Sequence, residues 1–333
     1  AILPVQRRSR SDRRRDRAAR RMTAAGGAAF RLLRLDVAPP PEAPLPATQP
    51  LPGRSALSVV AELLVPAGGP LFAGHFPGRP LLPGIAHLAL LCQVLEELAA
   101  RGILGGEAPG NAAIVEVSRF RLRREILPGD PIELRVEGSG EASAESGAFR
   151  FELRRQPAAG QPDEIASEGT VRTGIGDWRP RAAAPISRPD LAPGGPFRPV
   201  VELIPHAPPA RLLTEVLAGG AGAILCAGSI PGDHPLAAGS EAPGFLAIEL
   251  GAQAAAALEA LARPPGGSPR IGYLVGVRDA HLPARLPTGR ALHVTAVPAG
   301  AAAALAIYDM QVAEEGAAEP LATGTISTFL VEG

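Results

Sequence analysis

Two apolar segments, each opened by a Pro-Gly pair, constrain the fold of this 333-residue chain more than any other feature. Pro83-Gly84 precedes an apolar run that reaches about residue 101, and Pro243-Gly244 precedes the run FLAIELGAQAAAALEALA. Segments that are apolar almost all round the helix axis are typical of buried helices. Because proline cannot continue a helix, the Pro-rich stretch Gly74–Pro83 is predicted to be a stiff loop. We therefore predict two buried helices, the first of them preceded by a rigid loop.

Segments in which apolar and charged residues alternate follow the first helix. Phe120 and Leu122, for example, alternate with arginine residues. A period of two predicts strands with one face buried and one face in water. The predicted strands cover Leu57–Val65, segments around residues 120, 134 and 151, and, after the second helix, Ala291–Val297, Ala303–Val312 and Gly324–Leu330. A buried helix followed by an antiparallel meander thus occurs twice, which indicates an internal repeat.

Composition divides the chain into four parts. Residues 1–53 are Arg-rich and then Pro-rich, and they have no apolar period with which to pack, so we expect them to be disordered. Residues 54–175 and 199–333 contain the two repeats, and residues 176–198 form a linker rich in Pro, Gly and Arg. Ordered structure is expected to begin near Leu57.

The N-terminal run QRRSRSDRRRDRAARR is the one segment that suggests a nucleic acid or a membrane surface as a partner. It has no interleaved aromatic residues that would stack on bases, and no structured motif follows it. We interpret it as a tail, and we expect no nucleic-acid partner. A chain truncated to Pro46–Gly333 is therefore expected to keep its function.

Charge and cysteine content limit the class of protein further. The 33 basic residues, all of them arginine, balance 33 acidic residues. Cys92 and Cys226 lie in apolar surroundings and form no disulfide framework, so we expect a cytoplasmic protein. No apolar run approaches the roughly 18 residues of a membrane span. No set of His, Cys and carboxylate residues has metal-ligand spacing, so we expect no metal and no other cofactor.

The loop and the first helix read FAGHFPGRPLLPGIAHLAL. A histidine beside a helix N-terminus, where backbone N–H groups lack partners, suits the formation of an enolate. The stretch closely resembles the GHFPGRPxxPG signature of the beta-hydroxyacyl-acyl carrier protein dehydratases of the hot-dog fold, the FabZ and FabA type. The resemblance implies that His75 removes a proton and that the N–H of Gly84 binds the thioester oxygen, with Phe76 and Pro83 in the substrate site.

Two phrases in the second half resemble the same family. IPHAPPARLLTEV is similar to LPHRxPxLLxDRV, and PGFLAIELGAQ is similar to PGVxxxEAMAQ, where the Glu is the catalytic acid and the Gln hydrogen-bonds to it. By this resemblance Glu249 is the candidate acid and Gln253 is its orienting partner. The two residues are four apart and share one helix face. A buried carboxylate is costly unless it is paired, hydrogen-bonded or protonated, so it needs such a partner.

Each half departs from the family at a different catalytic position. On the first helix the position of the acid falls on Ala89, and in the second half the GHFPG loop is missing, which leaves His234 and Gly244 as a possible degenerate second site. His75 and Glu249 complete one site only if the halves pack as the subunits of a dimer do. We therefore expect an α+β tandem double hot-dog, in which two antiparallel sheets each wrap around a central helix and pack as a pseudo-dimer.

The other four histidines are assigned no catalytic role. His206 lies in the segment IPHAPPARLLTEV and is predicted to be structural. His87 lies two residues before the position of the missing acid, about 200° round the helix, and is predicted to be structural or surface-directed. Nothing in the sequence distinguishes His281 or His293.

The resemblance implies dehydration of 3-hydroxyacyl thioesters to trans-2-enoyl thioesters in fatty-acid or polyene biosynthesis. The substrate would be carried on the phosphopantetheine arm of an acyl carrier protein, and protonated Glu249 would donate to the departing hydroxyl. The halves also resemble the paired dehydratase subunits of aryl-polyene pathways, joined end to end. Three alternatives stay open: a thioesterase on the same fold, a non-catalytic acyl-binding or scaffolding module, and nucleic-acid binding through the Arg run. Acyl chain length and assembly beyond the pseudo-dimer also stay open.

Overall fold

The computed structural model of the chain describes residues 30–38, 55–104, 113–139, 143, 146–156, 162–174, 198–220, 222–263, 270–302 and 304–332. The segment before residue 30 and the predicted linker, apart from Arg198, lie outside these ranges. Among the helices of the described ranges, none is long and apolar enough to cross a membrane.

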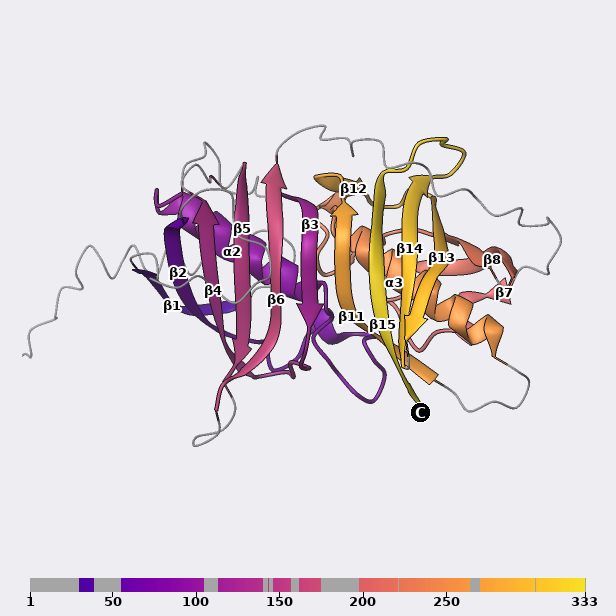
Figure 1. Cartoon of the computed structure of the whole chain (residues 1–333), viewed down its shortest axis with the longest axis horizontal. Helices are drawn as coiled ribbons and strands as arrows, with labels where there is room; N and C mark the ends of the chain where they lie inside the picture. Colours follow the sequence, from indigo (N-terminus) through magenta and orange to yellow (C-terminus); the bar gives the residue numbers. More distant parts are fainter. Residues whose placement is uncertain are drawn as a thin grey trace, which may run out of the picture.

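One continuous antiparallel sheet organises the molecule (Figure 1). Its thirteen strands follow the order β1-β2-β4-β5-β6-β3-β11-β15-β14-β13-β9-β8-β7. The halves join where β3 (Ala113–Leu122) pairs with β11 (Arg270–His281). The two predicted sheets thus form a single sheet, because unpaired strand edges hydrogen-bond readily to each other.

Several strands alternate between a buried and a solvent-facing side, as the period of two predicts. The prediction is wrong for β5, where residues 148–153 are all buried and Arg150 forms a buried ion pair with Glu137 at 3.1 Å. In the first half the remaining strands are β1 (Arg31–Ala38), β2 (Ser55–Leu64), β4 (Pro131–Ser139), β5 (Gly147–Arg155) and β6 (Glu164–Gly174). In the second half they are β7 (Arg198–Pro199), β8 (Leu213–Gly220), β9 (Ala223–Gly228), β13 (Leu292–Ala302), β14 (Leu305–Glu314) and β15 (Ala322–Glu332), together with the separate pair β10 (Glu241–Pro243) and β12 (Arg285–Pro287).

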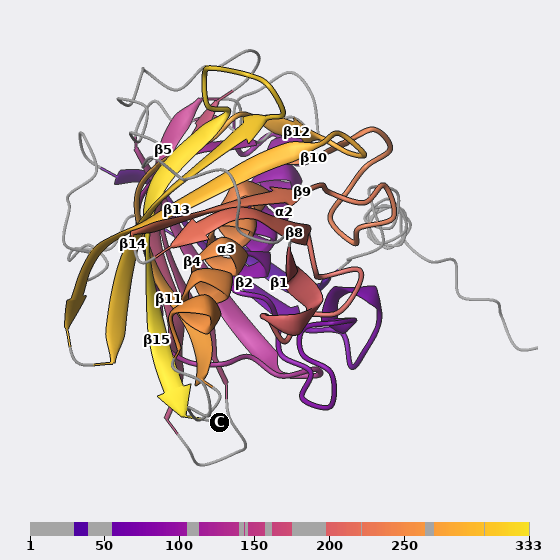
Figure 2. The same ribbon diagram turned by 90° about the vertical axis from the view of Figure 1, so that its right-hand side faces the viewer.

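Both predicted helices are present and buried. They are α2 (Ala86–Ala100) and α3 (Leu246–Ala262), and two short 3-10 turns, η1 (Pro70–Phe72) and η2 (Val200–Glu202), precede them in the two halves. Figures 1 and 2 show α2 and α3 on the same side of the sheet, which curves around them. Both helices contribute to one hydrophobic core, and this core fixes the starts of the helices, where the functional loops lie.

The strand β1 is a correction to the predicted disorder of residues 1–53. Arg31–Ala38 pairs antiparallel with β2 over nearly its whole length. Phe30 is buried, and its carbonyl oxygen accepts a hydrogen bond from Gln93 Nε2 at 2.9 Å. The prediction that ordered structure begins near Leu57 is therefore wrong for residues 30–38. Apolar and charged residues alternate only weakly in RLLRLDVA, so the period of two does not predict this strand.

We expect β1 to contribute to stability. A chain that begins at Pro39 should unfold at a lower temperature than a chain that begins at Ala29, because it loses β1 and leaves β2 as an exposed edge. Thermal unfolding of the two chains measures the difference. Equal melting temperatures would show that β1 is dispensable, as the expected tolerance of truncation to Pro46 requires.

His87 is a core residue, in agreement with a structural role. Its Nδ1 lies 2.9 Å from the hydroxyl of Ser167. Burial lowers the pKa of His87 from 6.5 to about 3. Below pH 6.5 the unfolded chain therefore binds a proton that the folded chain does not.

This shift predicts that the free energy of unfolding falls as the pH falls from 6.5 towards 3. One such group contributes at most about 1.4 kcal/mol per pH unit. The double variant His87→Leu with Ser167→Ala removes both polar partners and should show a shallower pH dependence over this window. Urea unfolding at a series of pH values measures the slopes, and identical slopes would contradict the assignment.

Candidate active site

The second half of the chain holds the His75 loop in place. The carbonyl oxygen of Gly74 accepts a hydrogen bond from the N–H of Ala207 at 3.0 Å. Gly74 has a φ of +78°, and a Cβ at this position would lie 1.9 Å from the carbonyl oxygen of Ala207. Only glycine therefore allows the two backbones to approach so closely.

A hydrogen bond to the backbone orients the ring of His75. Its Nδ1 lies 3.3 Å from the carbonyl oxygen of Leu81, which can only accept. Nδ1 therefore carries the proton, and the lone pair of the neutral ring is on Nε2. Phe76 stacks on the imidazole with a centroid distance of 4.3 Å. A half-buried ring with a free Nε2 lone pair suits a general base.

Glu249 projects from the first turn of α3 and is buried. Gln253 Nε2 donates to Glu249 Oε1 at 2.8 Å and to the carbonyl oxygen of Ala210 at 2.8 Å. Gln253 Oε1 accepts from the N–H of Leu212 at 2.9 Å. The backbone of residues 210–212 thus fixes the amide of Gln253, which must present its NH₂ group to the carboxylate.

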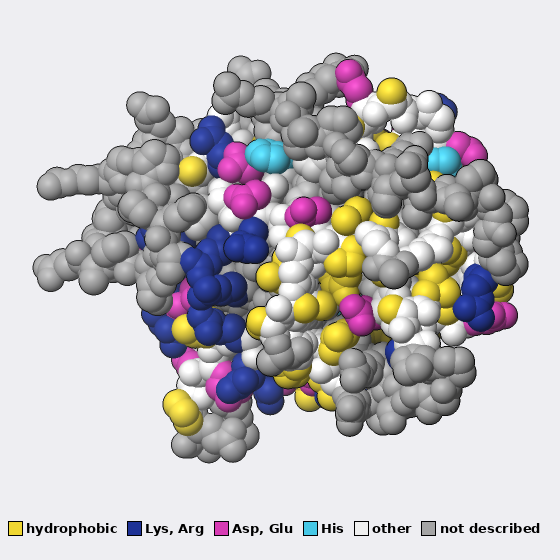
Figure 3. Space-filling model, turned by 45° about the vertical axis from the view of Figure 1, so that its right-hand side comes forward, with side chains coloured by type: hydrophobic (Ala, Val, Ile, Leu, Met, Phe, Trp, Pro, Cys, Tyr) yellow, Lys and Arg dark blue, Asp and Glu magenta, His cyan; other side chains and the backbone are white. Residues whose placement is uncertain are grey.

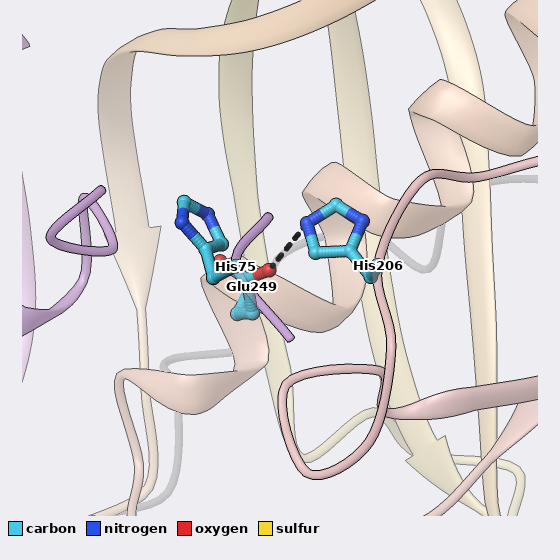
Figure 4. Close-up of side chains that lie close together, drawn as sticks. All are labelled: His75, His206 and Glu249. Carbon is cyan, nitrogen blue, oxygen red and sulfur yellow. Dashed lines mark ion pairs between the residues drawn. The ribbon is translucent and has the colours of Figure 1, made fainter. Parts of the chain in front are cut away.

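His206 also lies in this cluster, which the sequence analysis missed (Figure 4). Its Nε2 is 3.5 Å from Glu249 Oε1, and its ring centroid is 5.4 Å from that of His75 and 4.8 Å from that of Phe76. Burial, assisted by the nearby His75, lowers the pKa of His206 to about 3, so the ring is neutral at physiological pH. The only available signal was its place in the segment IPHAPPARLLTEV.

His75 and Glu249 line one small cavity, part of which is open to solvent. The other lining residues are Pro70, Leu71, Ala73, Pro83, Ile85, Ala210, His234, Pro235 and Leu236. The walls are mostly apolar, and both halves contribute to them. Phe76 contacts the rings of His75 and His206, and Gln253 hydrogen-bonds to Glu249.

Arg79 connects the loop to the second half at the surface. Its guanidinium donates to the hydroxyl of Tyr273 at 2.8 Å and to both carboxylate oxygens of Glu125, at 2.9 and 3.0 Å. The ring of Tyr273 lies edge-on to Phe76, with a centroid distance of 6.3 Å. These contacts hold the loop against β11.

The glycines at the two helix starts differ in one respect. Within the described residues, the N–H of Gly84 has no hydrogen-bond partner. The N–H of Gly244 donates to the carbonyl oxygen of Ala284 at 3.3 Å, and a Cβ there would lie 1.6 Å from the carbonyl oxygen of Pro283. The first helix start can therefore bind a substrate oxygen, whereas the second is occupied by its own backbone.

His234 lines the same cavity as His75. Its Nδ1 accepts a hydrogen bond from the N–H of Leu236 at 3.2 Å, which leaves the ring proton on Nε2. Burial lowers the pKa of His234 to about 4. At the corresponding place on α2, Ala89 packs against the core and offers no acid. His281 and His293 lie on β11 and β13, and His293 pairs with Glu315 at 3.9 Å.

Two known families match the two halves of the chain. The ApeI-like family, described as ApeI dehydratase, matches residues 53–162, and the ApeP-like family, described as ApeP dehydratase, matches residues 198–332. Each half of the chain thus matches a dehydratase family. The predicted resemblance to the hot-dog dehydratases is confirmed.

Curated relatives of these dehydratases match a shorter stretch. The 3-hydroxyacyl-[acyl-carrier-protein] dehydratase FabZ of Haemophilus influenzae (strain PittEE) is 44% identical over 70 residues, which are 20% of this chain and 45% of the relative. FabZ of Bradyrhizobium diazoefficiens is 31% identical over 71 residues, or 21% of this chain and 46% of the relative. The chain thus spans less than half the length of these curated relatives.

Solved structures of dehydratase domains have the same fold. The dehydratase domain of PpsC from Mycobacterium tuberculosis, in complex with C12:1-CoA, aligns with a TM-score of 0.54 and 15% identity over 82% of this chain and 94% of that domain. A trans-AT PKS dehydratase domain from Brevibacillus brevis aligns with a TM-score of 0.56 and 12% identity over 83% of this chain and 94% of that domain. At these identities the comparison shows the fold alone.

The close approach at Gly74 generates a prediction with an internal control. Gly74→Ala places a Cβ against the Ala207 carbonyl, while Gly78→Ala meets no atom within 4 Å at nearly the same φ of +79°. The backbone strain is therefore similar in the two variants, about 1–2 kcal/mol, and only Gly74→Ala adds a clash between the halves. We expect Gly74→Ala to lower the free energy of urea unfolding by more than Gly78→Ala does. Equal losses would show that this contact does not position the loop.

Proposed function

We propose that this protein dehydrates 3-hydroxyacyl thioesters carried on an acyl carrier protein to trans-2-enoyl thioesters, at one site between two hot-dog domains, residues 54–175 and 199–333. The supporting observation is that His75 and Glu249, from opposite halves of the chain, line one cavity. In this arrangement the two domains form a pseudo-dimer within one polypeptide.

Three groups divide the reaction between them. His75 Nε2 takes the proton from the α carbon, and the electron pair of that C–H bond forms the new double bond. The N–H of Gly84 binds the thioester oxygen as negative charge develops, a contact worth about 3 kcal/mol when the donor is preorganised. Glu249 gives its proton to the hydroxyl on the β carbon, which leaves as water. Phe76 and Pro83 shape the wall beside the acyl chain.

The surroundings of Glu249 indicate which oxygen carries the proton. Oε1 accepts from Gln253 at 2.8 Å and faces His206 Nε2 at 3.5 Å. The hydrogen bond from Gln253 favours Oε1 as the accepting oxygen and leaves Oε2 to hold and deliver the proton. Gln253 and His206 are therefore positioning residues, while His75 and Glu249 are the catalytic residues.

The second half supplies no second working site in this proposal. Ala89 stands where an acid would be required, and the N–H of Gly244 is bound to the Ala284 carbonyl. His234, which the sequence assigned to a degenerate site, lines the working cavity instead. We therefore expect one active site per chain.

The carrier protein would approach the arginine residues near β3. Arg121 and Arg123 are exposed there and share Glu168, at 3.8 and 2.6 Å, and Arg119 lies opposite Arg278 across the β3–β11 pair. Like charges opposite each other in a sheet are destabilising, so an anion is favoured beside them. Figure 3 shows basic side chains gathered beside a broad apolar area on one face of the molecule.

The substrate chemistry supports this approach. The phosphopantetheine arm contains a phosphate, which arginine binds well. Leu122, between Arg121 and Arg123, also lies next to Gly84, so β3 leads towards the site. The reaction uses no cofactor, and both cysteines are free thiols, which suits a cytoplasmic location.

The test is mass spectrometry of 3-hydroxyacyl carrier proteins after incubation with the enzyme. We expect the acyl group to lose about 18 mass units, the mass of one water. His75→Ala and Glu249→Gln should each reduce the rate about 100- to 10,000-fold, because each removes a positioned base or acid. The double variant should be little slower than either single variant, since the two groups act as a unit.

Two outcomes would contradict the assignment. Release of free carrier thiol in place of an enoyl product would indicate a thioesterase, and binding without turnover would indicate a non-catalytic module. His234→Ala serves as the control for position, because it should cost far less than His75→Ala. If His234→Ala abolished turnover and His75→Ala did not, catalysis would belong within the second half. Thermal melts confirm that each variant is folded.

A further inference from the structure

Three side chains with metal-ligand chemistry meet at one place in the molecule (Figure 4). One ligand atom each from His75, His206 and Glu249 lie within 4.8 Å of one another. All six histidines and both cysteines of the chain lie in the described ranges, and no other group of three such residues occurs there. The three residues are more than 40 positions apart in sequence, so no motif of closely spaced ligands predicts the cluster.

We propose that this cluster binds a divalent transition-metal ion of the zinc class, with His75 Nε2, His206 Nε2 and one Glu249 carboxylate oxygen as ligands. This goes beyond dehydration, which uses these side chains without a metal. Two imidazoles and one carboxylate are a ligand set that suits Zn²⁺, and a fourth position would face the cavity.

The distances support a four-coordinate ion. Ligand atoms about 2.1 Å from a tetrahedral zinc ion are about 3.4 Å from one another. His206 Nε2 and Glu249 Oε1 are already 3.5 Å apart. Only His75 has to move closer, and its half-buried side chain lies on a loop beside an open cavity.

Two of the three proposed ligands, His75 and Glu249, also have hydrogen-bond partners of their own. The Nδ1–H of His75 points to the Leu81 carbonyl at 3.3 Å, and Gln253 holds Glu249 at 2.8 Å. Such contacts orient metal ligands and strengthen binding. The Nδ1 of His206 is buried without a partner, so its ring lacks this support. We therefore expect micromolar affinity and not the tighter binding of a structural zinc site.

A bound ion would inhibit the enzyme. It would occupy the Nε2 lone pair of His75 and an oxygen of Glu249, the two groups that the reaction needs free. This consequence rests on the proposed function, whereas metal binding itself does not. Substrate and ion would compete for the cavity.

Isothermal titration of the full chain with ZnCl₂ tests binding directly. We expect one ion per chain, and we expect His206→Ala to weaken binding by about tenfold or more, the least that losing a direct ligand should cost. His293→Ala is the matched control, because it removes a histidine that also faces a glutamate, Glu315, outside the cluster. Its affinity should equal that of the unmodified chain.

Titration with CoCl₂ gives a second measurement that does not depend on one variant folding. An ion held by the cluster should produce visible absorption bands that disappear in both His206→Ala and Glu249→Gln. Absence of binding, or equal affinity in His206→Ala and the unmodified chain, would overturn the proposal. So would loss of binding in His293→Ala.

The dehydration assay with ZnCl₂ distinguishes metal binding from inhibition of the reaction. Inhibition that is relieved by EDTA and by excess substrate supports both the metal site and the catalytic roles. If zinc binds through His206 but the dehydration rate stays unchanged, the inhibition is refuted and the roles of His75 and Glu249 are in doubt, while the metal site stands.

Discussion

The hydrogen bond from the Ala207 N–H to the Gly74 carbonyl is the contact on which the site depends. It brings the loop of the first half against the segment that leads into the second. Three residues later the same segment begins to bind Gln253, and Gln253 binds Glu249. One short stretch of backbone therefore sets the positions of His75 and Glu249 relative to each other. A loop held only by its own half would not have this property.

The pairing of β3 with β11 allows the two halves to differ at the histidine loop and at the position of the acid. Because the sheet is continuous, both helices pack into one hydrophobic core. A buried carboxylate needs a hydrogen-bonding partner. Because Ala89 stands at the position of the acid on α2, the first half has no carboxylate there that needs one. The first half keeps the open helix start at Gly84, and the second keeps the buried carboxyl group of Glu249. These differences complement each other if, as we propose, the single active site draws on both halves.

Burial keeps His206, beside Glu249, and His234, in the cavity wall, in the neutral form. The pKa of His206 is lowered to about 3 and that of His234 to about 4, so both rings are neutral at physiological pH. They act through hydrogen bonds and lone pairs and add no positive charge beside Glu249. His206 completes the contacts of the carboxylate, and His234 presents its Nε2 proton from the wall of the cavity.

The sequence by itself determined the local structure and the chemistry of single residues. Apolar runs after Pro-Gly specified both helices, the period of two specified most strands, and the GHFPG and PGFLAIELGAQ phrases singled out His75 and Glu249, which line one cavity. The fusion of two sheets, the strand β1 and the place of His206 were decided only by the tertiary structure. Edge pairing depends on backbone groups that every residue carries, and the cluster joins residues 75, 206 and 249, which only folding brings within reach of one another.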